Sequence, residues 1–430
     1  MRIITLDGTT KKNLLEELLQ RSPSQYPEQE ETVRRIVARV QQEGDAAVFD
    51  YEAQFDHVSL TASTIEVREE EIKEAYDAVD ETLLSVMRKA LVNIREYHEK
   101  QVQQSWMTTR EDGIVLGQKI TPLDTVGVYV PGGKAVYPSS VLMNIVPAKI
   151  AGVPEIIMCT PPGKDGKVNP NTLVAAKEAG ADRVFKVGGA QAIAAMAFGT
   201  DSIPRADKIV GPGNIYVALA KKAVFGFAGI DSIAGPSEIL VLADETADPK
   251  YVAADLLSQA EHDEMASAIL ITTSAALAEQ VSKEVDAFLR ILPRREIIEK
   301  SLERFGYLLV AKDLSEAIDA ANEIAPEHLE ILMKEPFEVM TRIRNAGAIF
   351  LGPYSSEPLG DYFAGPNHVL PTNGTARFFS ALGVDAFVKR SSIISYSREA
   401  LKAIHTDIEA FAKCEQLTAH ANSIAVRFEQ

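Results

Sequence analysis

Two side chains that could hold a metal ion stand three residues apart in the segment DLLSQAEHD (255–263). If the apolar stretch that begins at Tyr251 is helical, Gln259 and His262 lie on one face of that helix. An amide oxygen and an imidazole directed toward one point supply half of a metal site. The alternative is a surface helix whose polar face includes one histidine, and a single pair with this spacing does not decide between the two.

A carboxyl group and an imidazole are adjacent in IAPEHLEIL (324–332), where Glu327 and His328 follow Pro326. Proline favours the first turn of a helix, so this segment predicts a loop-to-helix junction. There the two side chains would offer proton acceptors with different unperturbed pKa values, which suits general acid–base chemistry. The alternative is an exposed helix start at which Glu327 complements the helix dipole.

Further polar candidates lie near the C-terminus. The segment 355–374 is rich in Gly and Pro and carries Asp361 and His368. Long loops of this kind are usually functional or disordered, and the aromatic and apolar content here argues against disorder. In the tail, Glu415 and His420 are five residues apart, so they share a helix face only if the helix ends between them. A simple helix-terminal cation remains an alternative for His420. The other histidines are expected to be solvated: His57, His98 and His405.

Three glycine clusters each stand between a predicted strand and a predicted helix, at 128–138, 186–192 and 210–218. Free backbone N–H groups and a helix dipole at such turns favour an anion such as a pyrophosphate. None of the clusters matches the dinucleotide fingerprint or the P-loop, so tight strand-to-helix turns remain the alternative. The polar side chains that flank the turns could hydrogen-bond a nucleotide: Tyr129, Gln191 and Asn214.

The elements that must position these groups alternate between strand and helix. After a mainly helical N-terminal quarter, short apolar strands are predicted at 126–130, 156–160, 183–187 and 207–211, with helices at 171–180, 190–199 and 214–226. A second series contains strands at 238–244, 268–273, 307–312 and 347–352 and helices at 251–262, 275–289 and 314–325. This alternation predicts an α/β fold with parallel strands covered by helices on both faces. A helical tail is predicted at 397–420.

Composition limits the classes of function. The formal net charge of −17, from 61 acidic and 44 basic residues, disfavours binding to nucleic acid or to an anionic membrane surface. The two cysteines, Cys159 and Cys414, form no Cys-x-x-Cys pair, so the compartment is expected to be reducing and any zinc must use nitrogen and oxygen ligands. The sequence has neither an apolar signal region at its start nor a run long enough to span a membrane, which predicts a cytoplasmic protein.

Taken together, these motifs resemble the histidinol dehydrogenase family. The resemblance rests on SQAEHD, APEHLEI, GDYFAGPNHVLPT, GPSEI, YVPGG, GGAQA, GPGN and the terminal LTAH, which occur in the same order and at similar spacing from about residue 30 to 425. It implies two Rossmann-like parallel-sheet units, incomplete and duplicated, with small terminal segments and an intertwined homodimer. The expected division is an N-terminal segment 1–25, a first domain 26–128 with 238–381, an NAD-binding domain 129–237 and a tail 382–430.

The resemblance also implies roles for single residues. The family's zinc ligands correspond here to Gln259, His262, Asp361 and His420, and its catalytic pair to Glu327 and His328. Its NAD contacts correspond to Tyr129, Gln191 and Asn214. Beyond the zinc ligands and the catalytic pair, substrate binding is implied for Ser237, His368 and Glu415. In the dimer, the tail with Glu415 and His420 would complete the partner's site.

The implied activity is the NAD-dependent, four-electron oxidation of L-histidinol to L-histidine through L-histidinal. One competing class is a zinc hydrolase in which Glu327 activates water and the glycine turns are structural. Another is a noncatalytic relative that binds a small ligand, and a third is a related dehydrogenase of another amino alcohol or hydroxy acid. The hydrolase predicts no dependence on NAD, and the presence of every candidate polar residue disfavours the noncatalytic relative. The related dehydrogenase stays open, because it could differ in only a few pocket residues.

Overall fold

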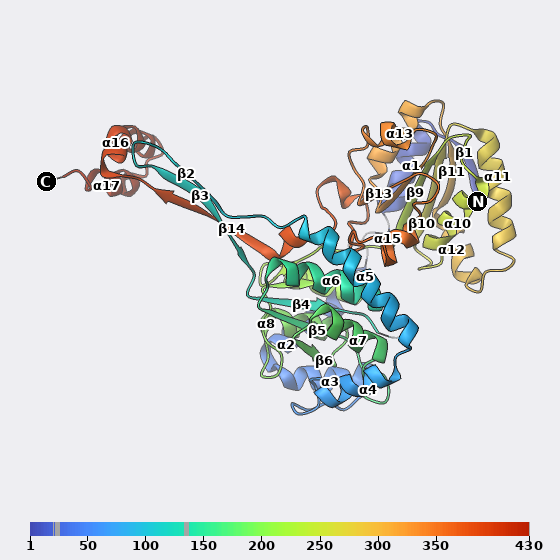
Figure 1. The fold of residues 1–430 in the computed structure, drawn as a ribbon, viewed down its shortest axis with the longest axis horizontal. Coiled ribbons are helices and arrows are strands. Elements are labelled where there is room, and N and C mark those ends of the chain that lie inside the picture. The colour runs from blue at the N-terminus through green and yellow to red at the C-terminus, as the bar shows by residue number, and fades with distance from the viewer. Residues whose placement is uncertain (20, 22–25, 133–136, 430) are drawn as a thin grey trace. The chain divides into compact units, whose positions relative to one another are not determined.

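The computed structural model describes residues 1–19, 21, 26–132 and 137–429. The chain divides into two compact units, Met1–Gln101 with Leu123–Phe387 and Val102–Pro122 with Val388–Gln430. The first unit contains two parallel sheets covered by helices, which confirms the predicted α/β class (Figure 1). Among the described helices, none combines the length and apolar character that a membrane span requires.

The first of the two sheets has five parallel strands in the order β6-β5-β4-β7-β8. Its strands are β4 (Thr125–Tyr129), β5 (Glu155–Cys159), β6 (Arg183–Phe185), β7 (Lys208–Val210) and β8 (Gly229–Ile230). The helices that connect them are α6 (Pro138–Ala151), α7 (Pro170–Ala179), α8 (Gly189–Phe198) and α9 (Ile215–Val224). When the strands are numbered 1 to 5 along the chain, their spatial order across the sheet is 3-2-1-4-5, which is the arrangement of a doubly wound nucleotide-binding sheet.

Alternation along the strands builds a core on each face of this sheet. On β5, Ile156 and Met158 pack with α6 and α7, whereas Ile157 and Cys159 pack with α8 and α9. All four side chains are fully buried. Burying a large apolar side chain stabilises the fold by roughly 1.5–3 kcal/mol. Because successive side chains of a strand point to opposite faces, β5 stabilises the helical layers on both faces of the sheet.

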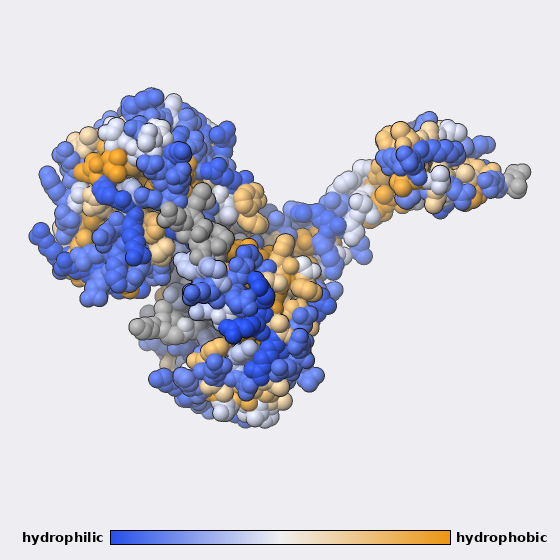
Figure 2. Space-filling view, turned by 180° about the vertical axis from the view of Figure 1, so that it is seen from behind, coloured by the Kyte–Doolittle hydropathy of each residue, from blue (hydrophilic) through white to orange (hydrophobic). Residues whose placement is uncertain are grey.

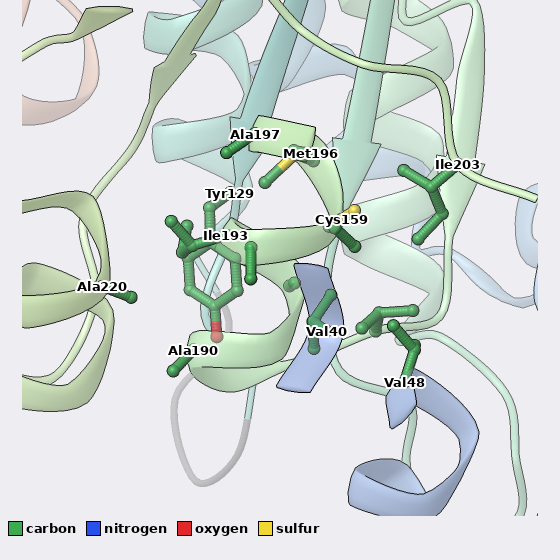
Figure 3. Packing of buried hydrophobic residues seen from close by; sticks show 14 of the residues in the cluster. Val40, Val48, Tyr129, Cys159, Ala190, Ile193, Met196, Ala197, Ile203 and Ala220 are labelled. Carbon is green, nitrogen blue, oxygen red and sulfur yellow. The ribbon is translucent and has the colours of Figure 1, made fainter. Parts of the chain in front are cut away.

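The N-terminal helices cover the same two faces. They are α2 (Pro27–Glu43), α3 (Asp45–Phe55), α4 (Glu69–Ala78) and α5 (Glu81–Glu99). Val40 of α2 and Val48 of α3 join the core that contains Ile193 and Cys159 (Figure 3). On the other face, Ile94 of α5 belongs to the core under α6 and α7.

The second sheet has six parallel strands in the order β1-β11-β10-β9-β12-β13. Its strands are β1 (Arg2–Thr5), β9 (Glu238–Ala243), β10 (Ser267–Thr272), β11 (Gly306–Val310), β12 (His328–Leu332) and β13 (Ala348–Leu351). Without β1, the order from β9 onward is again 3-2-1-4-5, which supports a duplicated unit. Its helices are α1 (Gly8–Leu19), α10 (Pro249–Ala260), α11 (Ala275–Phe288), α12 (Arg295–Phe305), α13 (Leu314–Ile324), α14 (Pro336–Met340) and α15 (Glu357–Tyr362).

The second unit is an antiparallel sheet with two helices. The strands β2 (Trp106–Thr109), β3 (Val115–Pro122) and β14 (Val388–Ser395) pair in the order β14-β3-β2, and α16 (Arg398–Cys414) and α17 (Thr418–Ala425) follow. Large apolar side chains lie exposed on this unit, among them Met107, Ile394 and Phe411, which are 64%, 73% and 72% exposed (Figure 2).

The packing differs from the expected domain boundaries. Residues 102–122 were expected in the first domain but belong to the second unit with 388–430. Two further differences lie within the first unit. Residues 27–99 pack on the five-stranded sheet, although 26–128 was expected to accompany 238–381. The segment 1–25 was expected to be a separate lead-in, but its strand Arg2–Thr5 pairs with β11 and its helix Gly8–Leu19 packs on the six-stranded sheet. Both differences arise because amphipathic helices and short edge strands do not specify in sequence which sheet they will cover.

Candidate active site

The predicted catalytic pair lies at the start of a buried strand, which corrects the predicted helix start. His328 is the first residue of β12 and pairs with Ile239 of β9 and Ala348 of β13. The strand HLEIL is buried at every position, because it runs between two other strands in the sheet. The Pro326 signal was misleading: proline also suits the first residues before a strand, and the apolar run decided the element.

Backbone contacts fix both members of the pair. The Glu327 Oε2 atom accepts a hydrogen bond of 2.9 Å from the Glu238 backbone N–H, and the His328 Nδ1 atom lies 3.0 Å from the Glu238 carbonyl oxygen. An Nδ1–H that donates to this carbonyl leaves Nε2 as the proton acceptor. The Nε2 atom is buried without a hydrogen-bond partner among the described residues and lies 3.8 Å from Asp361 Oδ1. The imidazole is therefore held with its basic nitrogen facing the site.

Burial and charge shift the pKa values of these groups in opposite senses. Burial raises the pKa of Glu327 to about 7. Burial lowers the pKa of His328, but the carboxylates of Glu327 and Asp361 outweigh this effect and raise it to about 10. Burial also opposes ionisation of Asp361, yet its interaction with His328 lowers the pKa of Asp361 to about 2. The site thus favours an ionised Asp361 beside the imidazole.

The predicted metal ligands from α10 and α15 meet at this place. Gln259 ends the last turn of α10 and is 1% exposed, with its Nε2 atom 3.3 Å from His328 Nδ1 and its Oε1 atom without a partner among the described residues. His262 follows the helix, and its imidazole interacts with the charge of Asp361. Burial lowers the pKa of His262, which favours the neutral form that binds metals.

These donor atoms suit a divalent cation. An unpartnered amide oxygen, a neutral imidazole and a carboxylate form a nitrogen and oxygen set of the kind that zinc accepts. In addition, His328, Glu357 and Asp361 each place one donor atom within 4.8 Å of the others. Of the four predicted zinc ligands, Gln259 and Asp361 lie beside His328 in the first unit, and the charge of Asp361 acts on the imidazole of His262.

His368 and Ser237 also border this site. His368 Nδ1 lies 3.0 Å from the Asp361 carbonyl oxygen, and its Nε2 atom lies 3.2 Å from Ser140 Oγ. Ser237 directly precedes β9, and its carbonyl oxygen accepts a hydrogen bond of 3.2 Å from the Arg21 guanidinium. Ser237 therefore lies where β9 begins, and His368 lies beside Asp361.

A group of buried acids behind the site was missed from the sequence. Glu357 is 2% exposed and accepts a hydrogen bond of 3.0 Å from Ser258 Oγ, and its backbone N–H donates to Glu330 Oε1 at 2.7 Å. Burial raises the pKa of Glu357 to about 8 and that of Asp255 to about 6. The spacing in the sequence indicates two of these acids. Asp255 stands four residues before Gln259 and shares its face of the helix, and Glu330 stands two residues after His328 and shares its face of the strand.

The predicted NAD contacts lie at the carboxyl edge of the five-stranded sheet. Tyr129 ends β4, and its hydroxyl oxygen accepts a hydrogen bond of 3.0 Å from the Gly189 N–H at the start of α8 (Figure 3). Gln191 lies in the first turn of α8 and is 1% exposed. Asn214 caps α9 by accepting hydrogen bonds from the N–H groups of Tyr216 and Val217.

Some backbone N–H groups of the glycine turns at this edge already donate hydrogen bonds to side chains of the protein. The Gly188 N–H donates to Glu52, the Gly189 N–H to Tyr129, and the Gly211 N–H to Asp231. These N–H groups are therefore not available to an anion in the way expected from the sequence. The first cluster, 128–138, falls partly outside the described residues, because 133–136 are not described.

Glu415 and His420 belong to the second unit. Both are exposed, and both line one groove of about 910 Å³ whose other walls include the apolar side chains of Ile404, Phe411 and Leu417. The structure thus brings these two predicted residues together. The helix α16 ends at Cys414 and α17 begins at Thr418. The helix therefore ends between Glu415 and His420, which was the condition for the two side chains to face one place.

Of the histidines expected to be solvated, His57 is exposed, His405 is half-buried against Glu409, and His98 departs most from the expectation. Its side chain is fully buried, with Nδ1 2.8 Å from the Ile94 carbonyl oxygen and Nε2 3.3 Å from Asn367 Nδ2. Burial lowers its pKa, so the ring is neutral and structural. It joins α5 to the loop that carries His368, a long-range contact with no local signal.

Comparisons with known proteins agree with this geometry. The family model described as histidinol dehydrogenase matches residues 19–428. Two parallel nucleotide-binding-type sheets and this match define the chain as an α/β oxidoreductase.

The most informative similarities are to individual histidinol dehydrogenases. A histidinol dehydrogenase from Halalkalibacterium halodurans is 59% identical over 401 residues, which cover 93% of this chain and 94% of that protein. One from Bacillus subtilis is 56% identical over 427 residues, or 99% of each chain. A crystal structure of histidinol dehydrogenase from Elizabethkingia anophelis superposes with a TM-score of 0.92 at 37% identity, covering 99% of this chain and 98% of that one.

The chain belongs to the histidinol dehydrogenase family. It is therefore an oxidoreductase of the kind that oxidises histidinol in histidine biosynthesis.

Proposed function

We propose that this protein oxidises L-histidinol to L-histidine through L-histidinal, with two molecules of NAD as the oxidising co-substrate. The proposal is carried by one observation: the buried imidazole of His328 presents an Nε2 atom that has no hydrogen-bond partner among the described residues, beside the Asp361 carboxylate and next to the carboxyl group of Glu327. A buried base with a fixed tautomer suits removal of a proton from an alcohol.

In the first oxidation, His328 Nε2 accepts the proton of the substrate hydroxyl while the carbinol carbon loses a hydride to NAD. The product of this step is the aldehyde. In the second, Glu327 removes a proton from water as it adds to the aldehyde, and the His328 imidazolium returns its proton to the carbonyl oxygen, which gives the hydrate and a neutral imidazole. His328 then accepts a hydroxyl proton of the hydrate as a second hydride leaves, and the carboxylic acid results. Burial raises the pKa of Glu327 to about 7, so the group can exchange a proton near neutral pH.

The metal of the proposed site is zinc, held by Gln259, His262, Asp361 and His420. When bound, zinc would anchor the amine and imidazole nitrogens of the substrate. A cation at Asp361 would also offset the negative charge that raises the pKa of His328, and it would move the imidazole toward the range of a working base. The unpartnered Gln259 Oε1 atom supports this ligand set.

The proposed quaternary structure is a homodimer in which the second unit carries Glu415 and His420 to the partner's site. The exposed apolar side chains of that unit support the proposal, because large exposed apolar surfaces mark interaction sites. Light scattering of the purified protein tests it: twice the chain mass is expected, and a monomer that is fully active would contradict it.

The direct test of the reaction is the amount of NADH formed per L-histidinol consumed, measured before and after a chelator and after zinc is returned. Two NADH per histidinol, lost with the chelator and restored by zinc, is the expected result. One NADH per histidinol would limit the reaction to the alcohol step. Histidinol consumption without NADH, or NADH formation that resists full metal removal, would contradict the proposed co-substrate or metal respectively.

A further inference from the structure

A buried glutamate from the N-terminal helices reaches the carboxyl edge of the five-stranded sheet. Glu52 lies on α3 and is fully buried. Its Oε1 atom accepts two hydrogen bonds, one of 3.0 Å from the Gly188 N–H and one of 2.8 Å from Gln191 Nε2. The neighbouring Gly189 N–H donates to the Tyr129 hydroxyl oxygen. One carboxyl group and one phenol therefore hold the turn between β6 and α8.

The turn itself has little freedom to rearrange. Gly189 has φ +59, a left-handed conformation that favours glycine. A Cβ atom at Gly188 would lie 2.8 Å from Pro161 Cβ and 3.0 Å from Asp56 Oδ2. The backbone thus passes in close contact with the carboxyl groups. Any change in the Glu52 carboxyl group is transmitted to the turn and to the Gln191 amide.

Glu52 and Asp56 form an acid pair one helical turn apart. The Glu52 Oε2 atom is buried without a partner among the described residues, and it can hydrogen-bond a neighbouring carboxylate only if it carries a proton. Burial raises the pKa of Glu52 to about 8 and also raises the pKa of Asp56. Three other titratable groups act on the pair. Burial raises the pKa values of Tyr129 and Cys159, which keeps both uncharged near pH 7, and the interaction with His57 lowers the pKa of Asp56.

We propose that Glu52 is a positioning residue of the NAD site, where its uncharged carboxyl group fixes the Gln191 amide and the Gly188–Gly189 turn in the arrangement that receives the cofactor. The inference rests on the proposed NAD dependence. An uncharged acid meets two needs at once. It accepts both N–H groups through Oε1, and it avoids a buried negative charge next to the place where an anionic dinucleotide would bind.

The two replacements of Glu52 separate these needs. Glu52→Gln keeps an acceptor oxygen for both N–H groups and an N–H donor toward Asp56, but it cannot ionise. Glu52→Ala removes the acceptor and leaves two buried donors without a partner. Asp50→Asn, an exposed acid on the same helix, is the matched control.

The experiment is calorimetric titration of the zinc-loaded protein with NAD from pH 7 to pH 9, with circular dichroism and zinc content measured for each variant. In the unmodified protein, the Kd for NAD is expected to rise about tenfold over this range as a group with a pKa of about 8 ionises. Glu52→Gln should bind NAD within about twofold of the unmodified protein at pH 7 and lose most of that rise. Asp50→Asn should behave like the unmodified protein.

Glu52→Ala should weaken NAD binding by about tenfold or more at pH 7, with zinc content unchanged. A Glu52→Ala protein that binds NAD normally, or a Glu52→Gln protein that keeps the full rise in Kd, would overturn the inference. If Glu52→Ala does not fold, the Glu52→Gln titration decides alone. An unmodified protein that does not bind NAD would overturn the proposed function as well, which distinguishes the two failures.

Discussion

The two parallel sheets share one strand order but carry their polar groups at opposite edges. In the five-stranded sheet, Tyr129 ends β4 and the Gly188–Gly189 turn follows β6, so the polar groups lie where the strands end. In the six-stranded sheet, Ser237 precedes β9 and His328 begins β12, so the polar groups lie where the strands start. Ligands of open α/β sheets usually bind beyond the carboxyl ends of strands, and only the first sheet follows that rule.

The site in the six-stranded sheet lies at the start of the strands because a helix returns to that edge. The helix α10 runs back from the end of β9, so its last turn, with Gln259, arrives at the edge where β9 and β12 begin. There it meets Asp361 of α15 and the imidazole of His328. Under the proposed function, the duplicated fold thus places a cofactor at one edge and an acid–base and metal site at another. Strand order alone does not say which edge is used.

The largest effect is expected at the six-stranded sheet. Replacement of His328 by Asn should lower kcat by roughly 10²–10⁴, because the variant lacks the base that accepts the alcohol proton. Zinc content and NAD affinity should stay near those of the unmodified protein. Steady-state kinetics with metal analysis is the measurement, and the exposed His57→Asn variant is the control. Turnover close to normal in His328→Asn would remove this residue from the mechanism.

A pair of core substitutions tests whether the two sheets contribute equally to the free energy of unfolding. Ile157 of β5 and Ile271 of β10 are fully buried on the second strand of each duplicated unit. Ile157→Ala and Ile271→Ala should each lower the free energy of unfolding by about 2–5 kcal/mol, because each leaves a cavity. Thermal unfolding followed by circular dichroism measures this loss. A normal transition in one variant would show that its sheet is less tightly packed than the other.

A smaller effect is expected from the buried acids behind the proposed metal site. Glu357→Gln should weaken zinc binding by about 10–100-fold, since groups that support metal ligands have effects of this size. NAD affinity should not change, because Glu357 belongs to the other sheet from Tyr129 and Gln191. Competition with a chromophoric chelator gives the zinc affinity, and the exposed Glu338→Gln variant is the control. Unchanged zinc affinity would assign Glu357 to packing alone.

Much of the fold was predictable because strands and helices alternate with clear periods. The apolar runs 156–160 and 268–273 became β5 and β10 with boundaries close to those expected. The strand β12 was missed because Pro326 and two polar residues precede a short apolar run, and periodicity cannot separate a buried strand from a helix start at that length. Pairing with β9 and β13 decides the matter, and that information is not local.

The candidate site was suggested by motifs, and its roles stay a prediction. The residues Gln259, His262, Asp361, Glu327 and His328 carry motifs that resemble a known family, and the structure places Gln259, Glu327 and Asp361 around His328. Glu52 and Glu357 gave no such signal, because a single glutamate in a helix usually lies in solvent. Both became notable only when their burial was known, together with the unpartnered Oε2 atom of Glu52. His98 was misjudged for the same reason, since its partner Asn367 is far away in the chain.

The central claim is that the six-stranded sheet holds the metal and the five-stranded sheet holds the cofactor. The most direct test is the measurement of zinc content and of the Kd for NAD in two variants, His262→Asn and Asn214→Ala. The account predicts that His262→Asn loses zinc but binds NAD normally, and that Asn214→Ala keeps zinc but binds NAD more weakly. Loss of NAD binding in His262→Asn with zinc retained, or the reverse pattern in Asn214→Ala, would contradict it.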